Sequence, residues 1–193
     1  MVQAQRFPWD FDGIIAGAPV LNEIGDGMLH LIWSGRANLD EEGKPILSPD
    51  KLPLIRNAVL ASCDADDGVE DGVLQDPRTC DWQPSDMQCS GQSMGQCLTA
   101  AEVGAVERIY TGAHNSNGQR IFPGGMSKGS EYEWSPAFVA ADGASPSVLN
   151  PNGMIGQFAR YLAYWEDGNG PGSDPLTDRK STRLNSSHSQ ISY

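Results

Sequence analysis

The sequence predicts an α/β chain whose short helix–turn–strand opening is followed by a larger, loop-rich and mainly helical part. The opening is the first observation behind this prediction: residues 1–10 read as the end of a helix that runs into a turn at Pro8, and Asp12–Pro19 (DGIIAGAP) reads as a short buried strand. Apolar residues then recur at helical spacing in four later segments. Long stretches rich in Asp, Gly, Pro and Ser separate those segments, and they predict irregular structure.

The second of the four helical segments has a clear beginning and a clear apolar face. Ser48 is a suitable N-cap and Pro49 occupies the first helical position, where a missing N–H costs nothing. The helix is expected to end near Cys63. Its apolar stripe consists of Leu52, Ile55, Val59 and Leu60.

The third helical segment carries signals at both ends. Thr99 and Glu102 form the T-x-x-E pattern of a capping box, in which each side chain bonds the backbone N–H of the other residue. Gly112 is the expected stop, because glycine readily adopts the left-handed conformation that ends many helices. The buried face is expected at Val103, Val106 and Ile109.

The first and last helical segments, Ile24–Ala37 and Gly153–Trp165, are indicated by apolar spacing alone. Beyond about Gly168 the pattern disappears, and we expect residues 171–193 to be disordered. Residues 179–193 resemble a vector or adapter read-through and are excluded from the fold, although an ordinary disordered tail is the alternative.

Charge and hydropathy exclude several classes of partner. The chain has 25 acidic and 13 basic side chains, a formal net charge of −12, which argues against nucleic acid and anionic membrane surfaces. No apolar run approaches the roughly 20 residues of a transmembrane helix. The opening lacks the pattern of a secretory leader, so we expect either a cytosolic protein or a true N-terminus that lies outside this chain.

The four cysteines favour disulfides over a metal thiolate site. Cys63, Cys80, Cys89 and Cys97 are even in number, and none forms the closely spaced pair that zinc sites use. Disulfides indicate an oxidising compartment, which favours the missing N-terminus. A cytosolic acidic protein with free thiols remains a rival interpretation.

The segment between Cys63 and Cys80, here called the acidic loop (residues 64–79), is the most chemically distinctive part of the chain. Calcium takes six to eight oxygen ligands and would relieve the repulsion among its carboxylates, while Gly68 and Gly72 allow the backbone to curl. The spacing is not that of an EF-hand, so we predict a calcium loop of another type, and a solvated acidic loop is the alternative. The six carboxylates are Asp64, Asp66, Asp67, Glu70, Asp71 and Asp76.

Five segments together resemble the tannase and feruloyl esterase family. The resemblance covers nearly all of residues 3–170, and its most specific parts are the opening and the acidic loop. In chain order, the segments are Gln3–Pro19, Cys63–Cys80, Cys97–Gly112, Phe122–Trp134 and Gln157–Asp167.

The resemblance implies a piece of an α/β-hydrolase core followed by most of its inserted, loop-rich, mainly helical lid domain. Residues 1–19 are expected to belong to the core and residues 20–170 to the lid. The family's Ser-His-Asp triad falls outside this chain, because the nucleophile precedes the equivalent of Gln3 and the acid and base follow the lid. Ser130 does not satisfy the nucleophile motif G-x-S-x-G.

The resemblance also implies a structural calcium site and two disulfides. The calcium ligands would be the side chains of Asp64, Asp67 and Asp71 and the backbone carbonyls of Val69 and Val73. Asp66 and Glu70 would then point outward. The disulfides would join Cys63 to Cys80 and Cys89 to Cys97, the first closing the acidic loop at a stabilisation of roughly 3 kcal/mol.

Several side chains are candidate contacts for an aromatic substrate. Aromatic residues at helical spacing more often pack in a core, and an arginine such as Arg160 more often forms an ion pair at the surface or inside the protein than a contact with a substrate carboxylate or phenolate. The candidates are Trp134, Phe138, Phe158 and Arg160, with Tyr161 and Trp165 beside them.

The predicted function is that of a secreted, extracellular or periplasmic carboxylic ester hydrolase that acts on phenolic acid esters such as feruloyl or galloyl esters. Its partner would be the aromatic ester, with neither nucleic acid nor membrane involved, and this chain alone would be inactive. The alternative is a stand-alone extracellular binding module stabilised by calcium and disulfides. Asp12–Pro19 argues against the module, which has no use for an isolated strand.

Overall fold

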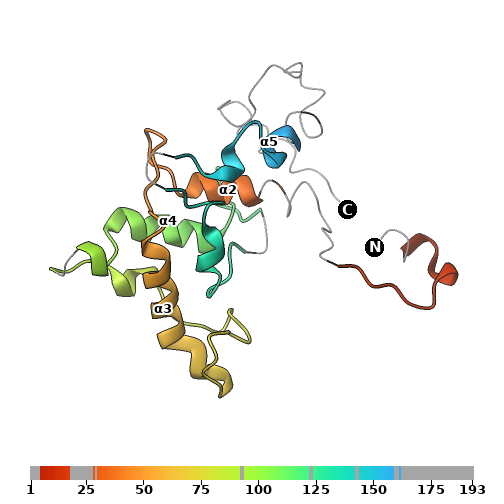
Figure 1. The fold of residues 1–193 in the computed structure, drawn as a ribbon, viewed down its shortest axis with the longest axis horizontal. Helices are drawn as coiled ribbons and strands as arrows, with labels where there is room; N and C mark the ends of the chain where they lie inside the picture. Colours follow the sequence, from red (N-terminus) through yellow and green to blue (C-terminus); the bar gives the residue numbers. More distant parts are fainter. Residues whose placement is uncertain are drawn as a thin grey trace.

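The computed structural model describes a body of short helices and long loops (Figure 1). The residues it describes are 5–17, 28, 30–91, 94–121, 124–141, 144–158 and 161. The α-helices are α2 (His30–Ala37), α3 (Lys51–Cys63), α4 (Ala100–Thr111) and α5 (Met154–Phe158). Short 3-10 turns are η1 (Pro8–Asp10), η3 (Asp64–Asp67), η4 (Pro84–Met87), η5 (Met94–Gln96), η6 (Glu131–Trp134) and η7 (Ser147–Leu149).

The opening segment differs from the prediction of a buried strand. Residues 12–17 form no strand, every residue from 5 to 17 is exposed, and Figure 1 shows this segment (red) apart from helices α2 to α4. A strand needs a neighbouring strand to take up its backbone hydrogen bonds, and the described residues contain only isolated bridges. The expected strand was therefore wrong over residues 12–17, and residues 18 and 19 lie outside the described part.

Helix α3 begins two residues later than the sequence indicates. Pro49 and Asp50 form a turn in which the N–H of Lys51 donates to the carbonyl of Ser48 at 3.1 Å. The hydroxyl of Ser48 donates to the carboxylate of Asp50, so Ser48 does not cap the helix. The helix does end at Cys63, and its buried face includes Leu52, Ile55 and Val59 as predicted, with Leu60 half-buried.

Helix α4 has both of its predicted ends. The N–H of Glu102 donates to Oγ1 of Thr99 at 3.2 Å, and the N–H of Thr99 donates to Oε2 of Glu102 at 2.7 Å, which completes the capping box. Gly112 follows the helix with φ of 80°, and a Cβ atom there would lie 2.5 Å from the carbonyl oxygen of Gly124. Both the conformation and the close approach therefore require glycine.

Helices α2 and α5 lie within Ile24–Ala37 and Gly153–Trp165, the two segments predicted from apolar spacing alone. In the first of these segments, residues 24–27 and 29 lie outside the described part. In the last, residues 159, 160 and 162–165 lie outside it. Gly35 brings α2 close to η7, because a Cβ atom on it would lie 2.6 Å from Cγ2 of Val148. Helix α2 packs against both η7 and α4.

The core lies where α2, α3, α4 and η6 meet, and one polar side chain crosses it. Asn38 is fully buried. Its Nδ2 donates to the carbonyls of Leu47 and Phe138 at 3.2 Å each, and its Oδ1 accepts the N–H of Leu47 at 2.8 Å. Fully buried apolar members of the core include Leu47, Ile55, Leu98, Ile109, Val139 and Trp134.

None of the helices within the described residues combines the length and the apolar composition that crossing a membrane requires.

Replacing Thr99 by Ala should destabilise the protein by about 1 kcal/mol, because the first turn of α4 then loses its N-cap acceptor. Urea unfolding followed by circular dichroism measures the change. Thr111→Ala is the matched control in the same helix, because the Thr111 hydroxyl is exposed and bonds the carbonyl of Glu107 without capping the helix. Equal losses in the two variants would contradict a capping role for Thr99.

Candidate functional site

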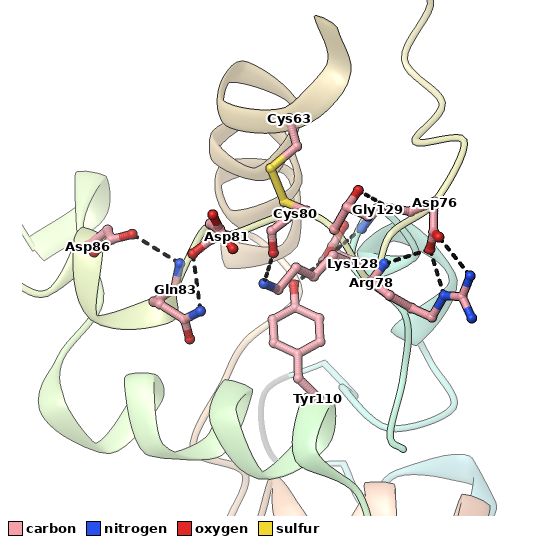
Figure 2. Close-up of a disulfide and its surroundings, with 12 residues drawn as sticks. Cys63, Asp76, Arg78, Cys80, Asp81, Gln83, Asp86, Tyr110, Lys128 and Gly129 are labelled. Atoms are coloured by element: carbon pink, nitrogen blue, oxygen red, sulfur yellow. Dashed lines mark hydrogen bonds and ion pairs between the residues drawn. A yellow bond between two sulfur atoms is a disulfide. The ribbon is translucent and has the colours of Figure 1, made fainter. Parts of the chain in front are cut away.

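All four cysteines form disulfides, in the two pairs that the family resemblance implies. Cys63 and Cys80 are joined with their Cα atoms 5.5 Å apart, and Cys89 and Cys97 with theirs 5.0 Å apart. Figure 2 shows the first bridge at the end of α3, where it ties the return of the acidic loop to the helix. The loop is thus closed at its two ends.

Inside the acidic loop, carboxylates accept hydrogen bonds from nearby backbone N–H groups. Asp67 accepts from Val69 at 2.9 Å and Asp71 from Val73 at 3.0 Å. Both carboxylate oxygens of Asp64 lie 3.0 Å from the N–H of Gly72. Positive φ angles of 91° at Gly68 and 80° at Gly72 give the loop its curl.

The donor types in this loop suit a hard cation, since carboxylates and backbone carbonyls are the ligands that calcium prefers. The exposed side chains of Val69 and Val73 leave their carbonyls as the groups available to an ion. Over the part of the chain that the structure describes, however, no three His, Cys, Asp or Glu side chains meet in an arrangement that could hold a metal. The calcium ligand set therefore stays a prediction.

A cavity of about 190 Å³ lies between the acidic loop and the Cys63–Cys80 disulfide. Asp66 lines it, although the resemblance has this residue pointing outward. Asp76 lines it too and accepts two bonds from the Arg78 guanidinium at 2.7 Å each, which lowers the pKa of Asp76 to about 2. Sequence reasoning missed this cavity, because its lining depends on how the loop returns to α3. The remaining lining residues are Cys63, Asp67, Leu74, Gln75, Thr79 and Cys80.

Two basic side chains hold the acidic loop from outside. Arg56 of α3 donates from Nη2 to the carbonyl of Gly72 at 3.0 Å. Lys128 donates from Nζ to the carbonyl of Cys80 at 2.5 Å, as Figure 2 shows. Burial lowers the pKa of Lys128, and the charges of Asp81 and Asp86 oppose that shift. Both contacts are to backbone carbonyls and leave the carboxylates of the loop unpaired with these cations.

A buried carboxylate lies close to this loop, on η6. Glu131 is fully buried, and its Oε1 accepts from the hydroxyl of Tyr110 at 2.5 Å and the N–H of Gly129 at 2.8 Å. Burial, the charge of Glu131 and this hydrogen bond raise the pKa of Tyr110. The indole ring of Trp134 meets the Tyr110 ring edge-on at 5.3 Å between centroids. The hydrogen bond from Tyr110 to Glu131 and the ring contact between Tyr110 and Trp134 both join α4 to η6.

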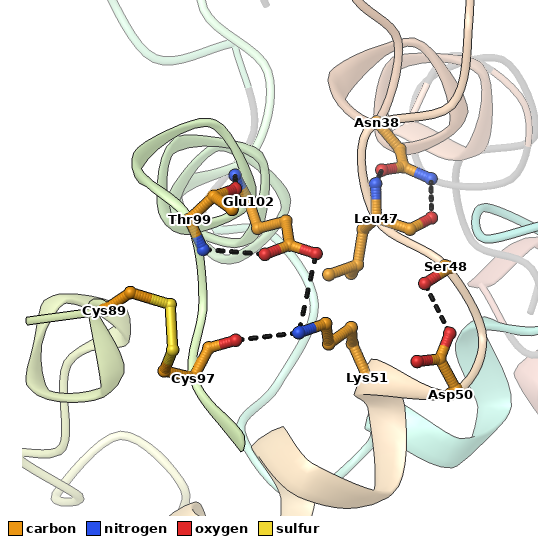
Figure 3. Close-up of polar contacts among 9 residues, drawn as sticks. All are labelled: Asn38, Leu47, Ser48, Asp50, Lys51, Cys89, Cys97, Thr99 and Glu102. Carbon is orange, nitrogen blue, oxygen red and sulfur yellow. Dashed lines mark hydrogen bonds and ion pairs between the residues drawn. A yellow bond between two sulfur atoms is a disulfide. The ribbon is translucent and has the colours of Figure 1, made fainter. Parts of the chain in front are cut away.

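The second disulfide is connected to both long helices through Lys51. Nζ of Lys51 donates to the carbonyl of Cys97 at 2.8 Å and lies 3.9 Å from Oε1 of Glu102 (Figure 3). Lys51 and Glu102 are both buried. No local pattern of residues indicates this pair, because Lys51 and Glu102 are far apart in the chain.

The predicted substrate contacts fall in different environments. Trp134 is fully buried and Phe138 is 3% exposed, so both pack in the core of this chain, as the alternative interpretation holds. Phe158 is half-buried against the same core. Tyr161 is exposed, whereas Arg160 and Trp165 lie outside the described residues. The described candidates therefore form no shared aromatic-binding surface, and the role of the set as substrate contacts stays a prediction.

The hydroxyl of Ser130 is taken up by hydrogen bonds within the fold. It donates to the carbonyl of Ser127 at 2.6 Å and accepts the indole N–H of Trp134 at 3.0 Å. The imidazole of His114 lies against the carbonyl of Gly112, with Nδ1 at 2.8 Å. These two side chains therefore do not form the nucleophile–base pair that a serine hydrolase requires.

A family model described as tannase and feruloyl esterase matches residues 1–159. Curated relatives include an uncharacterized esterase of Xanthomonas campestris, 37% identical over 77% of this chain and 27% of its own length. A probable feruloyl esterase B of Emericella nidulans is 39% identical over 69% of this chain and 25% of its own. The chain thus spans about a quarter of the length of these relatives.

Solved structures share the fold of this chain. An esterase from Aspergillus oryzae aligns with a TM-score of 0.72 and 27% identity, over 96% of this chain and 34% of its own. Feruloyl esterase B from Aspergillus oryzae aligns with a TM-score of 0.71 and 25% identity, over 96% of this chain and 35% of its own. The chain has the fold of the corresponding third of these esterases.

Tyr110→Phe should destabilise the protein at neutral pH by about 1–3 kcal/mol, because the buried carboxylate of Glu131 loses a hydrogen-bond donor. The raised pKa of folded Tyr110 means that the unfolded state releases its proton first as the pH rises. The stabilisation by Tyr110 is therefore fully present below the ordinary pKa of 10.0 and declines above it.

Chemical unfolding between neutral pH and pH values above 10 checks this expectation. The difference in unfolding free energy between wild type and Tyr110→Phe should shrink as the pH rises. Tyr132→Phe, at an exposed ring, is the matched control. A difference for Tyr110→Phe that stays constant with pH would count against the buried Tyr110–Glu131 pair.

Proposed function

Because the chain belongs to the tannase and feruloyl esterase family, we propose that it is part of a secreted carboxylic ester hydrolase acting on phenolic acid esters. The match of the family model to residues 1–159 is the observation that carries this proposal. Relatives named as probable feruloyl esterases B support the substrate class, with feruloyl or galloyl esters as the expected substrates. The two disulfides support an oxidising, extracellular or periplasmic location.

Within such an enzyme, this chain would supply a piece of the core and most of the lid. A catalytic serine outside the chain would attack the ester carbonyl, and a histidine would transfer the proton. The lid would shape the acyl pocket and exclude water. The exposed apolar side chains of residues 5–17, among them Trp9 and Ile15, support the core assignment, because several large apolar side chains exposed together mark a surface that packs against another part of a protein.

The acidic loop would hold a structural calcium ion rather than a catalytic one. Its carboxylates repel one another, and a divalent cation would offset that repulsion while the disulfide keeps the loop closed. Asp64, Asp67 and Asp71, with the carbonyls of Val69 and Val73, are the proposed ligands. The ordered turns that these residues already form support a loop prepared to accept an ion.

A domain exchange tests the proposed enzyme. Residues 20–158 of this chain would replace the matching segment of the feruloyl esterase B from Aspergillus oryzae, which keeps its own catalytic residues. We expect the chimera to hydrolyse methyl ferulate or methyl gallate, whereas the same enzyme with that segment deleted should not. A folded chimera without activity on any phenolic ester would refute the assignment as a lid of this enzyme class.

The isolated chain of 193 residues should hydrolyse neither methyl ferulate nor methyl gallate, because the proposed triad lies outside it. Product release measured by chromatography checks this, with the intact Aspergillus oryzae enzyme as the positive control. Turnover by the purified chain that survives Ser130→Ala would show that another nucleophile is present. Turnover abolished by Ser130→Ala would move the catalytic role to Ser130.

Calcium should raise the melting temperature of the isolated chain by about 5–10 °C at saturation, because an ion bound only by the folded state stabilises it. Asp71→Asn should abolish the shift, and Glu70→Gln is the matched control, since its carboxylate is not among the proposed ligands. Thermal unfolding with calcium or with a chelator measures the effect. Equal shifts in both variants, or none in the wild type, would rule out this ligand set.

A further inference from the structure

We propose that Arg56 couples the conformation of the acidic loop to that of the turn η6, so that a change at the Tyr132 ring alters the order of the loop. Arg56 projects from α3 between the two segments. Its Nη2 bonds the loop, and its guanidinium carbon lies over the ring of Tyr132. The coupling requires no bound cation, because every contact in it comes from the protein's own residues.

On the loop side, Arg56 fixes one end of the peptide unit that joins Gly72 to Val73. The carbonyl of that unit accepts from Nη2 of Arg56 at 3.0 Å. The N–H at its other end donates to Oδ1 of Asp71 at 3.0 Å. Loss of Arg56 would therefore release a peptide unit whose orientation also sets the position of the Asp71 carboxylate.

On the turn side, the guanidinium carbon of Arg56 lies 4.8 Å from the centre of the Tyr132 ring, within the range of a cation–π contact. Tyr132 is 51% exposed, whereas its neighbours Glu131 and Trp134 in the same turn are fully buried. The buried residues anchor the turn in the core, and this turn presents the Tyr132 ring to the guanidinium. A guanidinium that stacks on a ring has part of its side chain positioned before it bonds the loop.

The charge of Arg56 is directed at a carbonyl and a ring instead of a carboxylate. In the part of the chain that the structure describes, Arg56 makes no ion pair, although the acidic loop beside it contains six carboxylates. Its hold on the loop therefore depends on the Tyr132 ring and the Gly72 carbonyl together. Removal of the ring should weaken the bond to Gly72, even though Tyr132 itself bonds no loop residue among those described.

Hydrogen–deuterium exchange on the full chain tests this coupling through peptides that cover residues 69–76. The variants are Tyr132→Leu, Arg56→Gln and the double variant, with Tyr161→Leu as the matched control at another exposed tyrosine. Peptides from α4 serve as an internal reference for global folding. Arg56→Lys, which keeps the charge over the ring but lacks the planar fork, provides a second variant at the same position.

We expect Tyr132→Leu and Arg56→Gln each to speed exchange in the loop about two- to fivefold, and the α4 peptides and Tyr161→Leu to remain at wild-type rates. The double variant should exchange no faster than Arg56→Gln, because the ring acts only through Arg56. Arg56→Lys should fall between wild type and Arg56→Gln. Wild-type exchange in Tyr132→Leu, or a double variant whose acceleration equals the product of the two single effects, would overturn the proposal.

Discussion

Loops make up most of this fold, and the polar groups of their backbones need partners wherever they are buried. Regular sheets are absent from the described residues, so side chains take over much of this role. Asn38 bonds two chain segments in the core, and Arg108 donates twice to the carbonyl of Ala37, at 3.1 and 2.7 Å. Lys51 and Lys128 each donate to the carbonyl of a disulfide-bonded cysteine. The positions of the helices depend on these long-range bonds as well as on apolar packing.

In the acidic loop, hydrogen bonds to the backbone act against the repulsion between carboxylates. Its carboxylates repel one another, yet the loop has a defined path because its ends are closed by the disulfide and its backbone is bonded from within and from α3. The bonds from Arg56 and Lys128 go to backbone carbonyls, so these two cations do not occupy the carboxylates, whereas Asp76 is paired with Arg78 inside the loop. The order of the loop therefore comes from its disulfide and its hydrogen bonds, in spite of the charge of its side chains.

In the core, the Tyr110–Glu131 pair also depends on hydrogen bonds to a buried polar group. A buried carboxylate is costly unless hydrogen bonds compensate it, and here a hydroxyl and a backbone N–H both bond Oε1 of Glu131, while its buried Oε2 has no partner among the described residues. The contact joins α4 to η6, the turn that also carries Tyr132, whose ring lies against Arg56. The proposed lid thus has one connected polar framework, from α4 through η6 and Arg56 to the loop.

The sequence by itself determined those features that depend on neighbours a few residues apart. The capping box of Thr99 and Glu102, the stop at Gly112 and the apolar face of α3 are local patterns, and the structure contains all of them. The cysteine pairs also followed from the sequence, through the resemblance to a family. Family membership was visible for the same reason, because it rests on short motifs in a fixed order.

Only the tertiary structure decided features whose partners are distant in the chain. An apolar run such as residues 12–17 becomes a strand only beside another strand, and none of the described residues supplies one. Aromatic spacing could not tell that Trp134 faces the core, because a ligand surface and a core use the same residues. The carbonyl partners of Lys51 and Lys128 lie 46 and 48 residues away in the sequence. Such contacts are set by how the helices and loops pack, which no local pattern of residues encodes.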